Sequence, residues 1–322
     1  MNLNDYESLV NRLKKNQKKS KNFINSERIE AYRIYQKDLP QIPYLIDIYK
    51  DQALISEQGK RLHDEEVHLR DEHIGQIQKA ITEVFGITPE KQFFKTRERQ
   101  KGQQQYQAYD PKSQNFFTIK EGELTFLVNL ERYLDSGLFL DHRPLRKKLV
   151  QGLSKDKRVL NLFCYTGSLS VASAVGGAKQ VYSVDMSATY LDWAVENFKL
   201  NNLDYKQHRF MQADCLKEIE KLNEAKETFD LIILDPPSFS NSKRMDDDLD
   251  IQEDHPILIR NCMRLLSPGG ELYFSTNKKR FELHRVISEN YNVKEISQWT
   301  IPMDFHHSNI HRSFIITQKS IS

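Results

Sequence analysis

The chain has 322 residues, of which 39% are apolar and 29% are charged, so it is long enough to form two domains with separate cores. No apolar run approaches the roughly 18 residues that a membrane-spanning helix needs, and the amino terminus lacks the pattern of an export signal. Three cysteines (Cys164, Cys215 and Cys262) without a CxxC pair argue against a disulfide framework. The net charge of +2 indicates no particular partner, and we expect a globular, cytoplasmic protein.

Positive charge is concentrated in two segments. From Arg12 to Arg28 there are seven Lys or Arg residues and one acid, Glu27. The second segment contains Arg143, Arg146, Lys147, Lys148, Lys155, Lys157 and Arg158. Such clusters in a near-neutral chain are typical of a surface that binds a polyanion, but a solvated helix face explains them equally well.

The first part of the chain, residues 1–135, has the pattern of a small α+β domain. Leu9 and Leu13 give the mostly polar residues 3–21 a helical spacing, which predicts a basic helix at the surface. A second helix is predicted over about residues 61–84. Short β-like runs flank it: EAYRIYQKDL, YLIDIYK, KQFFKTRER, NFFTIKEG and LTFLVNL. We therefore expect a helix packed on a small sheet.

From about Arg158 the pattern changes to apolar runs separated by segments of helix length: RVLNLF, QVYSVD, HRFMQ, FDLIILD and GELYFST. Continuous apolar strands spaced in this way predict a parallel sheet covered by helices on both faces. The LSPGG segment before GELYFST predicts a helix stop and a turn. VKEISQWTI and RSFIITQ are joined by only about a dozen residues, too few for a helical crossover, and predict a terminal hairpin. Residues 136–322 are thus expected to form a doubly wound, Rossmann-like α/β sheet with an antiparallel terminal strand.

Ligands of open α/β sheets bind at the carboxyl ends of the strands, where the strand order reverses. The first strand of this half is followed by NLFCYTGSLS, with Gly167 at the start of a helix. A dinucleotide-binding loop needs GxGxxG, but here Tyr165 and Ser170 stand where two of those glycines would be. The loop favours a ligand without phosphates over NAD, although a structural turn also explains one glycine.

Acidic residues follow the next two strands. Asp185, about 18 residues past Gly167, can accept both hydroxyl groups of a ribose. Asp214 can receive the amino group of an adenine. Either aspartate alone is equally well explained as a helix N-cap.

The fourth strand is followed by a rigid loop formed by Asp235, Pro236, Pro237, Ser238 and Phe239. Two prolines fix the backbone, so the loop can hold a flat base against a reacting methyl group. The residues after the four strands together predict an adenosyl-binding site, and hence a methyltransferase that uses S-adenosylmethionine.

Several segments resemble motifs of the class I methyltransferases that modify ribosomal RNA: NLFCYTGS, VDMS, QADC and LDPPSFSNSKRM, with KTRERQKGQQQYQ and DSGLFLDHR upstream. The resemblance extends over nearly the whole chain. It points to the C-terminal half of the bifunctional RlmKL family, which makes N7-methylguanosine in 23S rRNA. That family also carries an upstream methyltransferase half and an RNA-binding THUMP domain that are absent here; Met1 favours a free-standing relative. The target nucleotide and the oligomeric state stay open.

The resemblance implies roles for individual residues. Those implied to bind the cofactor are Tyr165, Gly167 and Ser168 on the methionine side, Asp185 at the ribose, Met186, Asp214 and Cys215 around the adenine, Asp235 near the methyl donor, and Arg143 at the carboxylate. The catalytic loop is Asp235, Pro236, Pro237 and Phe239. Phe239 is our candidate to stack on an extruded base, with core packing as the alternative. The candidates for binding RNA phosphates are Arg97, Arg99, Lys101, Lys243 and Arg244, with solvated turns as the alternative.

The chemistry of methyl transfer narrows the target atom. Carbon 5 of cytosine needs a cysteine nucleophile, which related enzymes place after the fifth strand, where this chain has Phe274-Ser275-Thr276-Asn277. Guanine N7 needs neither a nucleophilic residue nor a general base, so alignment can supply most of the catalysis. The resemblance favours guanine N7. An exocyclic amine, with Asp235 accepting its hydrogens, is the alternative.

The expected partner is 23S rRNA before full subunit assembly, with neither a membrane nor a metal. His306, His307 and His311 cluster near the last hairpin, but no cysteine or acid completes a zinc spacing. Two other classes of function compete: a non-catalytic RNA-binding protein and a small-molecule methyltransferase. The retained aspartates argue against the first, and the basic amino-terminal domain argues against the second.

Overall fold

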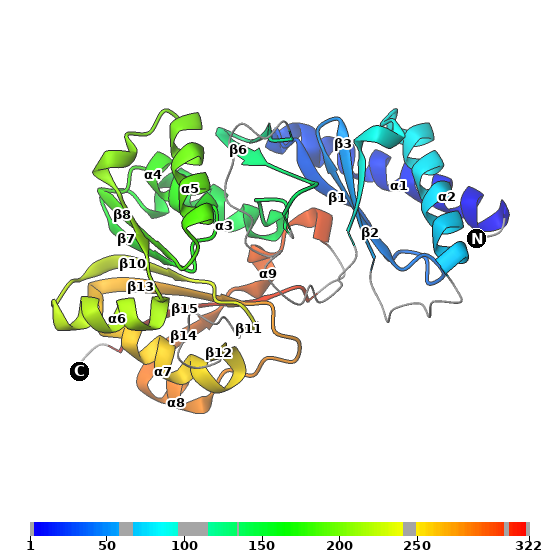
Figure 1. Cartoon of the computed structure of the whole chain (residues 1–322). Helices are drawn as coiled ribbons and strands as arrows, with labels where there is room; N and C mark the ends of the chain where they lie inside the picture. The colour runs from blue at the N-terminus through cyan, green and yellow to red at the C-terminus, as the bar shows by residue number, and fades with distance from the viewer. Residues whose placement is uncertain are drawn as a thin grey trace.

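The computed structural model describes residues 3–57, 67–95, 115–133, 135–240, 249–305 and 309–319. These residues form two main sheets with helices packed against them and a short hairpin between them (Figure 1). The smaller sheet, beside the blue and cyan helices, lies to the right in Figure 1, and the larger sheet lies to the left. No helix in these ranges is long and apolar enough to cross a bilayer.

The amino-terminal sheet has the strand order β1-β2-β3-β4. Its elements are α1 (Leu3–Glu27), β1 (Ala31–Gln36), β2 (Tyr44–Tyr49), β3 (Gln52–Glu57), α2 (Val67–Phe85) and β4 (Gln92–Lys95). β1, β2 and β3 are antiparallel neighbours, whereas β4 returns parallel to β3 after α2. Helices α1 and α2 lie side by side against this sheet, as the predicted α+β domain requires (Figure 1).

Helix α1 differs from its prediction in length and in burial. It continues past residue 21 to Glu27, and Leu9 and Leu13 are fully buried against the sheet and α2. The helix is therefore part of the core on one side and exposed only on its basic side. Strand β3 was not predicted, because the short run QALISE mixes polar and small residues and follows β2 after only two residues.

A two-stranded hairpin, β5 (Phe117–Glu121) and β6 (Leu124–Val128), lies between the two sheets. Side chains of α5 and of its C-cap bind the backbone of β6: Asn197 accepts a hydrogen bond from Leu127 N at 2.8 Å, and Asn201 accepts one from Thr125 N at 2.9 Å. On its other side, β5 is hydrogen-bonded to the segment before β1, where Glu30 N donates to the Lys120 carbonyl at 2.9 Å. The hairpin is thus bonded to both halves, although the predicted boundary near residue 135 assigns it to the first domain. That boundary stays a prediction.

The carboxyl-terminal sheet has seven strands in the order β14-β15-β13-β10-β7-β8-β9. The elements of this half are α3 (Arg143–Lys148), β7 (Arg158–Leu162), α4 (Ser168–Val175), β8 (Gln180–Asp185), α5 (Ala188–Leu200), β9 (Arg209–Gln212), α6 (Cys215–Glu224), β10 (Phe229–Leu234), β11 (Phe239–Ser240), β12 (Leu249–Asp250), α7 (Ile251–Met263), β13 (Leu266–Thr276), α8 (Arg285–Asn290), β14 (Tyr291–Glu295), α9 (Ser297–Thr300) and β15 (Arg312–Gln318). In the seven-stranded sheet, β15 runs antiparallel to β13 and β14, and the other neighbouring pairs are parallel. β11 and β12 form a separate antiparallel pair. The doubly wound sheet with an antiparallel terminal strand is confirmed.

Alternate residues of the central strands supply two different cores. In β10, Leu231 and Ile233 pack into one apolar cluster, while Ile232 and Leu234 pack into the other. Both faces of the strand are therefore covered, which explains why its sequence is continuously apolar rather than alternating.

The last elements differ in detail from the expectation. Helix α7 ends at Met263, but the LSPGG segment forms the irregular beginning of β13 instead of a separate turn. The predicted strand VKEISQWTI is shorter, because β14 ends at Glu295 and the residues after it form α9. β14 and β15 still pair antiparallel, with Tyr291 opposite Gln318.

Candidate active site

The predicted site lies at the carboxyl ends of the central strands. β7 pairs with β8 on one side and with β10 on the other, so the order of strands along the chain reverses at β7. Loops that follow these strands diverge above the sheet edge and leave space for a ligand. They carry Tyr165, Gly167, Asp185 and Asp235, so one edge brings together residues from three loops.

The loop from β7 to α4 contains three left-handed residues. Phe163, Tyr165 and Gly167 have φ angles of 56°, 51° and 72°. A Cβ at Gly167 would lie 2.7 Å from the Cβ of Ala194 in α5, so only glycine lets α4, which begins at Ser168, approach α5 so closely. Left-handed backbone at the two non-glycine residues costs of order 1–2 kcal/mol each, a strain that is concentrated at functional sites.

Asp185 is fixed at the end of β8 by two backbone donors. Tyr165 N donates to Oδ2 and Ser187 N donates to Oδ1, both at 2.9 Å. Burial raises the pKa of the Asp185 carboxyl, and these backbone hydrogen bonds act in the opposite direction. The N-cap of α5 is Ser187, whose Oγ accepts from Tyr190 N, so the N-cap explanation of Asp185 is wrong. A carboxylate has about four acceptor positions, which leaves some for ribose hydroxyls.

The residues predicted around the adenine lie beside Asp185. Asp214 is the N-cap of α6 and accepts a hydrogen bond from Leu216 N at 2.9 Å, so this explanation of Asp214 holds in the structure. Cys215 is buried beneath the site, where its Sγ accepts from Phe163 N at 3.3 Å. Met186 lies in the turn between β8 and α5.

None of the three cysteines offers a nucleophile to the site. All are free and buried, and burial raises the pKa of Cys164, Cys215 and Cys262 above the ordinary thiol range. A buried neutral thiol is a weak nucleophile. These positions are consistent with the rejection of 5-methylcytosine chemistry.

Asp235, at the end of β10, is held through both carboxylate oxygens. Ser275 Oγ at the end of β13 donates to Oδ1 at 2.5 Å, and His142 Nε2 lies 3.0 Å from Oδ2. The pairing of β10 with β13 makes the first contact foreseeable, since Leu234 and Phe274 are register partners. His142 was not predicted, and its only signal in the sequence is its place in the LDHR motif beside Arg143.

The loop after Asp235 presents an aromatic ring to solvent. Pro236 is buried and Pro237 is exposed, and Ser238 Oγ donates to Asn277 Oδ1 at 2.5 Å. Phe239 follows with 55% of its surface exposed, so the core-packing alternative for this residue is wrong. An exposed ring after a rigid loop is available to stack on a base.

Arg143 requires a correction. Its guanidinium is buried, with Nη1 donating to Asp304 Oδ1 and Nη2 donating to the carbonyl of Ala31, both at 2.7 Å. Glu121 Oε2 lies 3.4 Å from Nε. The guanidinium thus faces β1, the hairpin between the sheets and the short turn η7 (Met303–Phe305), so Arg143 joins the two halves of the molecule and does not face a cofactor carboxylate.

Other predicted residues fall outside the described ranges or have internal partners. Arg97, Arg99, Lys101, Lys243 and Arg244 lie outside the described residues, as do His306 and His307. His311 is described: its Nδ1 lies 3.2 Å from Asp141 Oδ2, and its Nε2 lies 3.0 Å from Thr300 Oγ1. Asp141, His142 and His311 have ligand-type atoms within 4.8 Å of one another, but each of these side chains already has a protein partner. The absence of a metal stays a prediction.

The segment before η4 (Leu140–His142) docks on the glycine loop. Gly137 N donates to the Tyr165 phenol oxygen at 3.0 Å, and Thr166 Oγ1 donates to the Gly137 carbonyl at 2.6 Å. The Tyr165 hydroxyl is therefore engaged within the protein. Gly137 has a φ of 92°, and a Cβ there would lie 2.1 Å from the ring of Trp193.

Replacing Gly137 with alanine is expected to destabilise the fold by about 3 kcal/mol or more, because it combines a left-handed φ with overlap on a fully buried ring. Urea denaturation measures this decrease in the free energy of unfolding. Gly75→Ala is the matched control, since Gly75 lies inside α2 and an alanine Cβ there would have no atom within 4 Å, so the helix should gain about 0.5–1 kcal/mol. Equal effects of the two substitutions would contradict this account of the loop.

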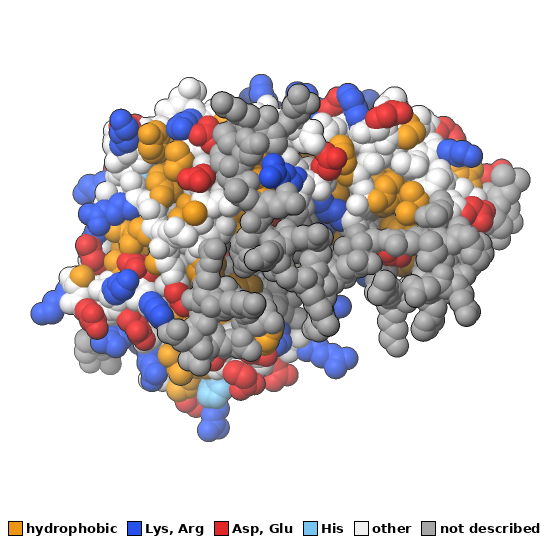
Figure 2. All heavy atoms as spheres, viewed as in Figure 1, with side chains coloured by type: hydrophobic (Ala, Val, Ile, Leu, Met, Phe, Trp, Pro, Cys, Tyr) orange, Lys and Arg blue, Asp and Glu red, His pale blue; other side chains and the backbone are white. Residues whose placement is uncertain are grey.

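The two basic segments differ in exposure. In the first, Arg12 and Lys14 lie near Asp38 and Glu83, at 3.9 Å and 2.8 Å. In the second, Arg146 is fully buried, so this segment is not the continuous surface cluster that the sequence indicates. Figure 2 likewise shows Lys and Arg side chains interspersed with acidic ones on the visible face. A single strongly positive patch is not visible there.

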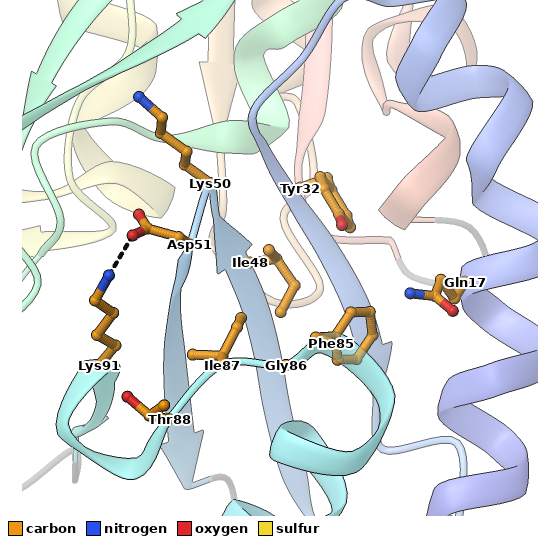
Figure 3. Close-up of a pocket in the computed structure, with 10 residues that line it drawn as sticks. All are labelled: Gln17, Tyr32, Ile48, Lys50, Asp51, Phe85, Gly86, Ile87, Thr88 and Lys91. Atoms are coloured by element: carbon orange, nitrogen blue, oxygen red, sulfur yellow. Dashed lines mark hydrogen bonds and ion pairs between the residues drawn. The ribbon is translucent and has the colours of Figure 1, made fainter.

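A separate cavity of about 370 Å³ lies in the amino-terminal domain. The rings of Tyr32 and Phe85 and the aliphatic side chain of Ile48 line it, with Lys50 and Lys91 at its margin (Figure 3). Its residues come from α1, β1, β2, the turn between β2 and β3, the end of α2 and the segment after it, and none belongs to the strand-end site.

Comparisons with known proteins show which family the chain resembles. A family model described as S-adenosylmethionine-dependent methyltransferase matches residues 73–298. "Ribosomal RNA large subunit methyltransferase K" from Neisseria meningitidis is 44% identical over 320 residues, covering 99% of this chain and 89% of that protein. "Ribosomal RNA large subunit methyltransferase K/L" from Shewanella sp. is 46% identical over 314 residues, covering 96% of this chain but only 43% of that protein.

Solved structures show the same architecture. The methyltransferase SMU.776, crystallised with SAH, superposes with a TM-score of 0.77 at 26% identity, covering 97% of this chain and 81% of that chain. The arrangement described above fits such a ligand, since a carboxylate with spare acceptor positions and a strained glycine loop meet at the switch point. The chain therefore belongs to the family of S-adenosylmethionine-dependent methyltransferases, with large-subunit rRNA methyltransferases K and K/L among its relatives.

Proposed function

We propose that the protein transfers a methyl group from S-adenosylmethionine to a base of large-subunit (23S) rRNA, before full subunit assembly, with guanine N7 as the target atom. The rRNA substrate is supported by the names of relatives at 44% and 46% identity. The observation that carries the proposal for this chain is Asp235, fixed through both oxygens at the strand edge, next to the exposed ring of Phe239.

The cofactor supplies an electrophilic methyl group on a sulfonium. The protein binds the adenosyl group through Asp185 and receives an extruded base on Phe239. The rigid loop after Asp235 excludes other orientations of that base. Holding two reactants in line can supply several kcal/mol of the barrier reduction. Neither a thiolate nor a general base is needed when the attacking atom is a nitrogen without a proton.

The preference for guanine N7 over an exocyclic amine rests on the family resemblance. An amine target would use the Asp235 carboxylate to accept its hydrogens, and Ser275 and His142 occupy one position on each of its oxygens. Since a carboxylate offers about four positions, an amine could still be accepted there and is the second candidate.

Mapping of modified nucleotides tests this function. 23S rRNA from cells that lack the protein should lose one chemically cleavable N7-methylguanosine, and the purified protein with S-adenosylmethionine should restore it. Loss of an amine-methylated base instead would overturn the choice of atom. An unchanged set of rRNA modifications would overturn the rRNA substrate.

The amino-terminal domain is our candidate for the RNA-binding part. Its cavity combines Tyr32 and Phe85 with Lys50 and Lys91, and single-stranded RNA is held by aromatic stacking together with cations. Lys91 Nζ lies 2.5 Å from Asp51 Oδ2 at the cavity margin, so a phosphate would have to displace this ion pair (Figure 3). Replacing both Lys50 and Lys91 with glutamine should lower RNA affinity and reduce the salt dependence of binding by about one unit for each phosphate that is no longer neutralised.

Fluorescence anisotropy with an rRNA fragment at several salt concentrations measures both effects. Lys206→Gln is the control, because Lys206 is an exposed residue of η6 (Tyr205–Gln207), outside the cavity and the strand-end site. If the double variant kept both the affinity and the salt slope, the cavity would not be a site for RNA.

A further inference from the structure

His142 lies between the two halves of the molecule and reaches the carboxylate that we place at the methyl-transfer site. It ends η4, directly before α3, and its side chain is only 9% exposed. Its Nε2 is 3.0 Å from Asp235 Oδ2, opposite the oxygen that accepts from Ser275. The carboxylate is thus held from two sides by groups from η4 and β13.

Four ionisable groups face His142 from the elements packed around it. Asp235 directly follows β10, and Asp141 precedes His142 in η4. The ring of His311, from the segment before β15, stacks on it with centroids 5.3 Å apart and 7° between the planes. Arg146 of α3 contributes a positive charge, although its guanidinium is paired with Glu121 at 2.6 Å. Two carboxylates that favour the protonated imidazole are therefore set against one nearby cation that disfavours it.

The charges around His142 favour its protonated form. Burial disfavours the charge, but Asp235 and Asp141 outweigh burial and raise the pKa of His142 to about 9, with Arg146 acting in the opposite direction. A histidine with this pKa is protonated at neutral pH and donates a charge-assisted hydrogen bond to Asp235.

We propose that His142 is a positioning residue for methyl transfer, which holds Asp235 and the proline loop behind it in the orientation that receives the base. Asp235 is followed by two prolines whose φ angles are fixed, so the backbone between Asp235 and Phe239 has few free dihedral angles. The inference rests on the proposed function for the presence of a base at this loop, but it does not depend on which atom of the base is methylated.

The charge predicts a direction for the pH dependence. The protonated form is the one that positions Asp235, so the contribution of His142 is complete at neutral pH and is lost as pH rises through about 9. The rate of methyl transfer should therefore fall as pH rises through about 9, because His142 loses its proton.

His142→Gln tests the proposal, because the amide can still donate a hydrogen bond but carries no charge. Single-turnover methylation of the mapped rRNA should be about 10- to 100-fold slower at pH 7.5 and should lack the decline near pH 9. Affinity for S-adenosylmethionine, measured by calorimetry, should be unchanged. Ionisation of the RNA bases affects both proteins equally, so the difference between the two profiles isolates His142.

His208→Gln is the matched control, since His208 is half-buried in the same domain and accepts a hydrogen bond from Val181 N at 3.1 Å, away from Asp235. It should keep the rate and the alkaline decline. A His142→Gln profile that matches the wild type would overturn the positioning role. Absence of any rRNA target would instead overturn the proposed function.

A second measurement keeps the proposal testable should His142→Gln fold poorly. Histidine side-chain NMR of the unaltered protein should show one imidazole that titrates near pH 9, and Asp235→Asn should lower that value. If no imidazole titrated above about pH 7.5, the protonated His142 on which the proposal depends would not exist.

Discussion

An Asp235→Ala variant should lose methyl-transfer activity by a factor of about 1,000 or more while keeping its fold. Removal of the carboxylate releases Ser275 and His142 and frees the loop that carries Phe239, so the base is no longer aligned. Loss of one preorganised polar group at a reacting centre costs about 10²–10³ in rate, and the loss of loop orientation adds to this. The fold should persist with some loss of stability, because the interaction of Asp235 with protonated His142 contributes to stability at neutral pH and is removed with the carboxylate.

Single-turnover transfer of a radiolabelled methyl group, with a thermal melt of the same preparation, measures both quantities. Asp204→Ala is the control, since Asp204 caps the exposed turn η6 and accepts from Lys206 N at 3.1 Å. Asp235→Asn should retain part of the activity, because an amide oxygen can still accept from Ser275. Turnover of Asp235→Ala at the wild-type rate would remove Asp235 from the site.

Asp185→Ala is expected to weaken binding of S-adenosylmethionine by about 100- to 10,000-fold. Two hydrogen bonds from ribose hydroxyls to a carboxylate contribute about 1.5–3 kcal/mol each, and each 1.4 kcal/mol corresponds to a factor of ten in affinity. The substitution also leaves the Tyr165 and Ser187 amides without their acceptor, which loosens the glycine loop.

Calorimetric titration with the cofactor gives this number directly. Asp192→Ala is the control, because Asp192 is an exposed residue of α5, the helix that follows Asp185 in the chain. Asp185→Asn should fall between the wild type and alanine. Equal cofactor affinity for Asp185→Ala and the wild type would mean that the ribose is held elsewhere.

The parts of the fold that follow from local sequence were predictable. The central strands are continuously apolar because both faces are buried, and the short connection before β15 forced an antiparallel end to the sheet. Residues that end parallel strands gather at one edge by topology alone, so the order of strands and loops along the chain was enough to predict that Asp185 and Asp235 lie at the same edge of the sheet.

Contacts between distant segments were not predictable in this way. Arg143 and Asp304 are 161 residues apart in the chain, and nothing in the spacing of either segment reveals that they pair. The LDHR motif drew attention to its arginine, whereas the residue that reaches the site is His142. Periodicity reports which face of an element is buried, but it does not report which charged partner a buried side chain meets.

A crystal structure with S-adenosylhomocysteine tests the central claim most directly. We expect the ribose hydroxyls within hydrogen-bond distance of the Asp185 carboxylate, and the sulfur directed toward the loop of Asp235 and Phe239. A ligand bound elsewhere, with Asp185 and Asp235 turned away from it, would contradict the assignment of this sheet edge as the place of methyl transfer.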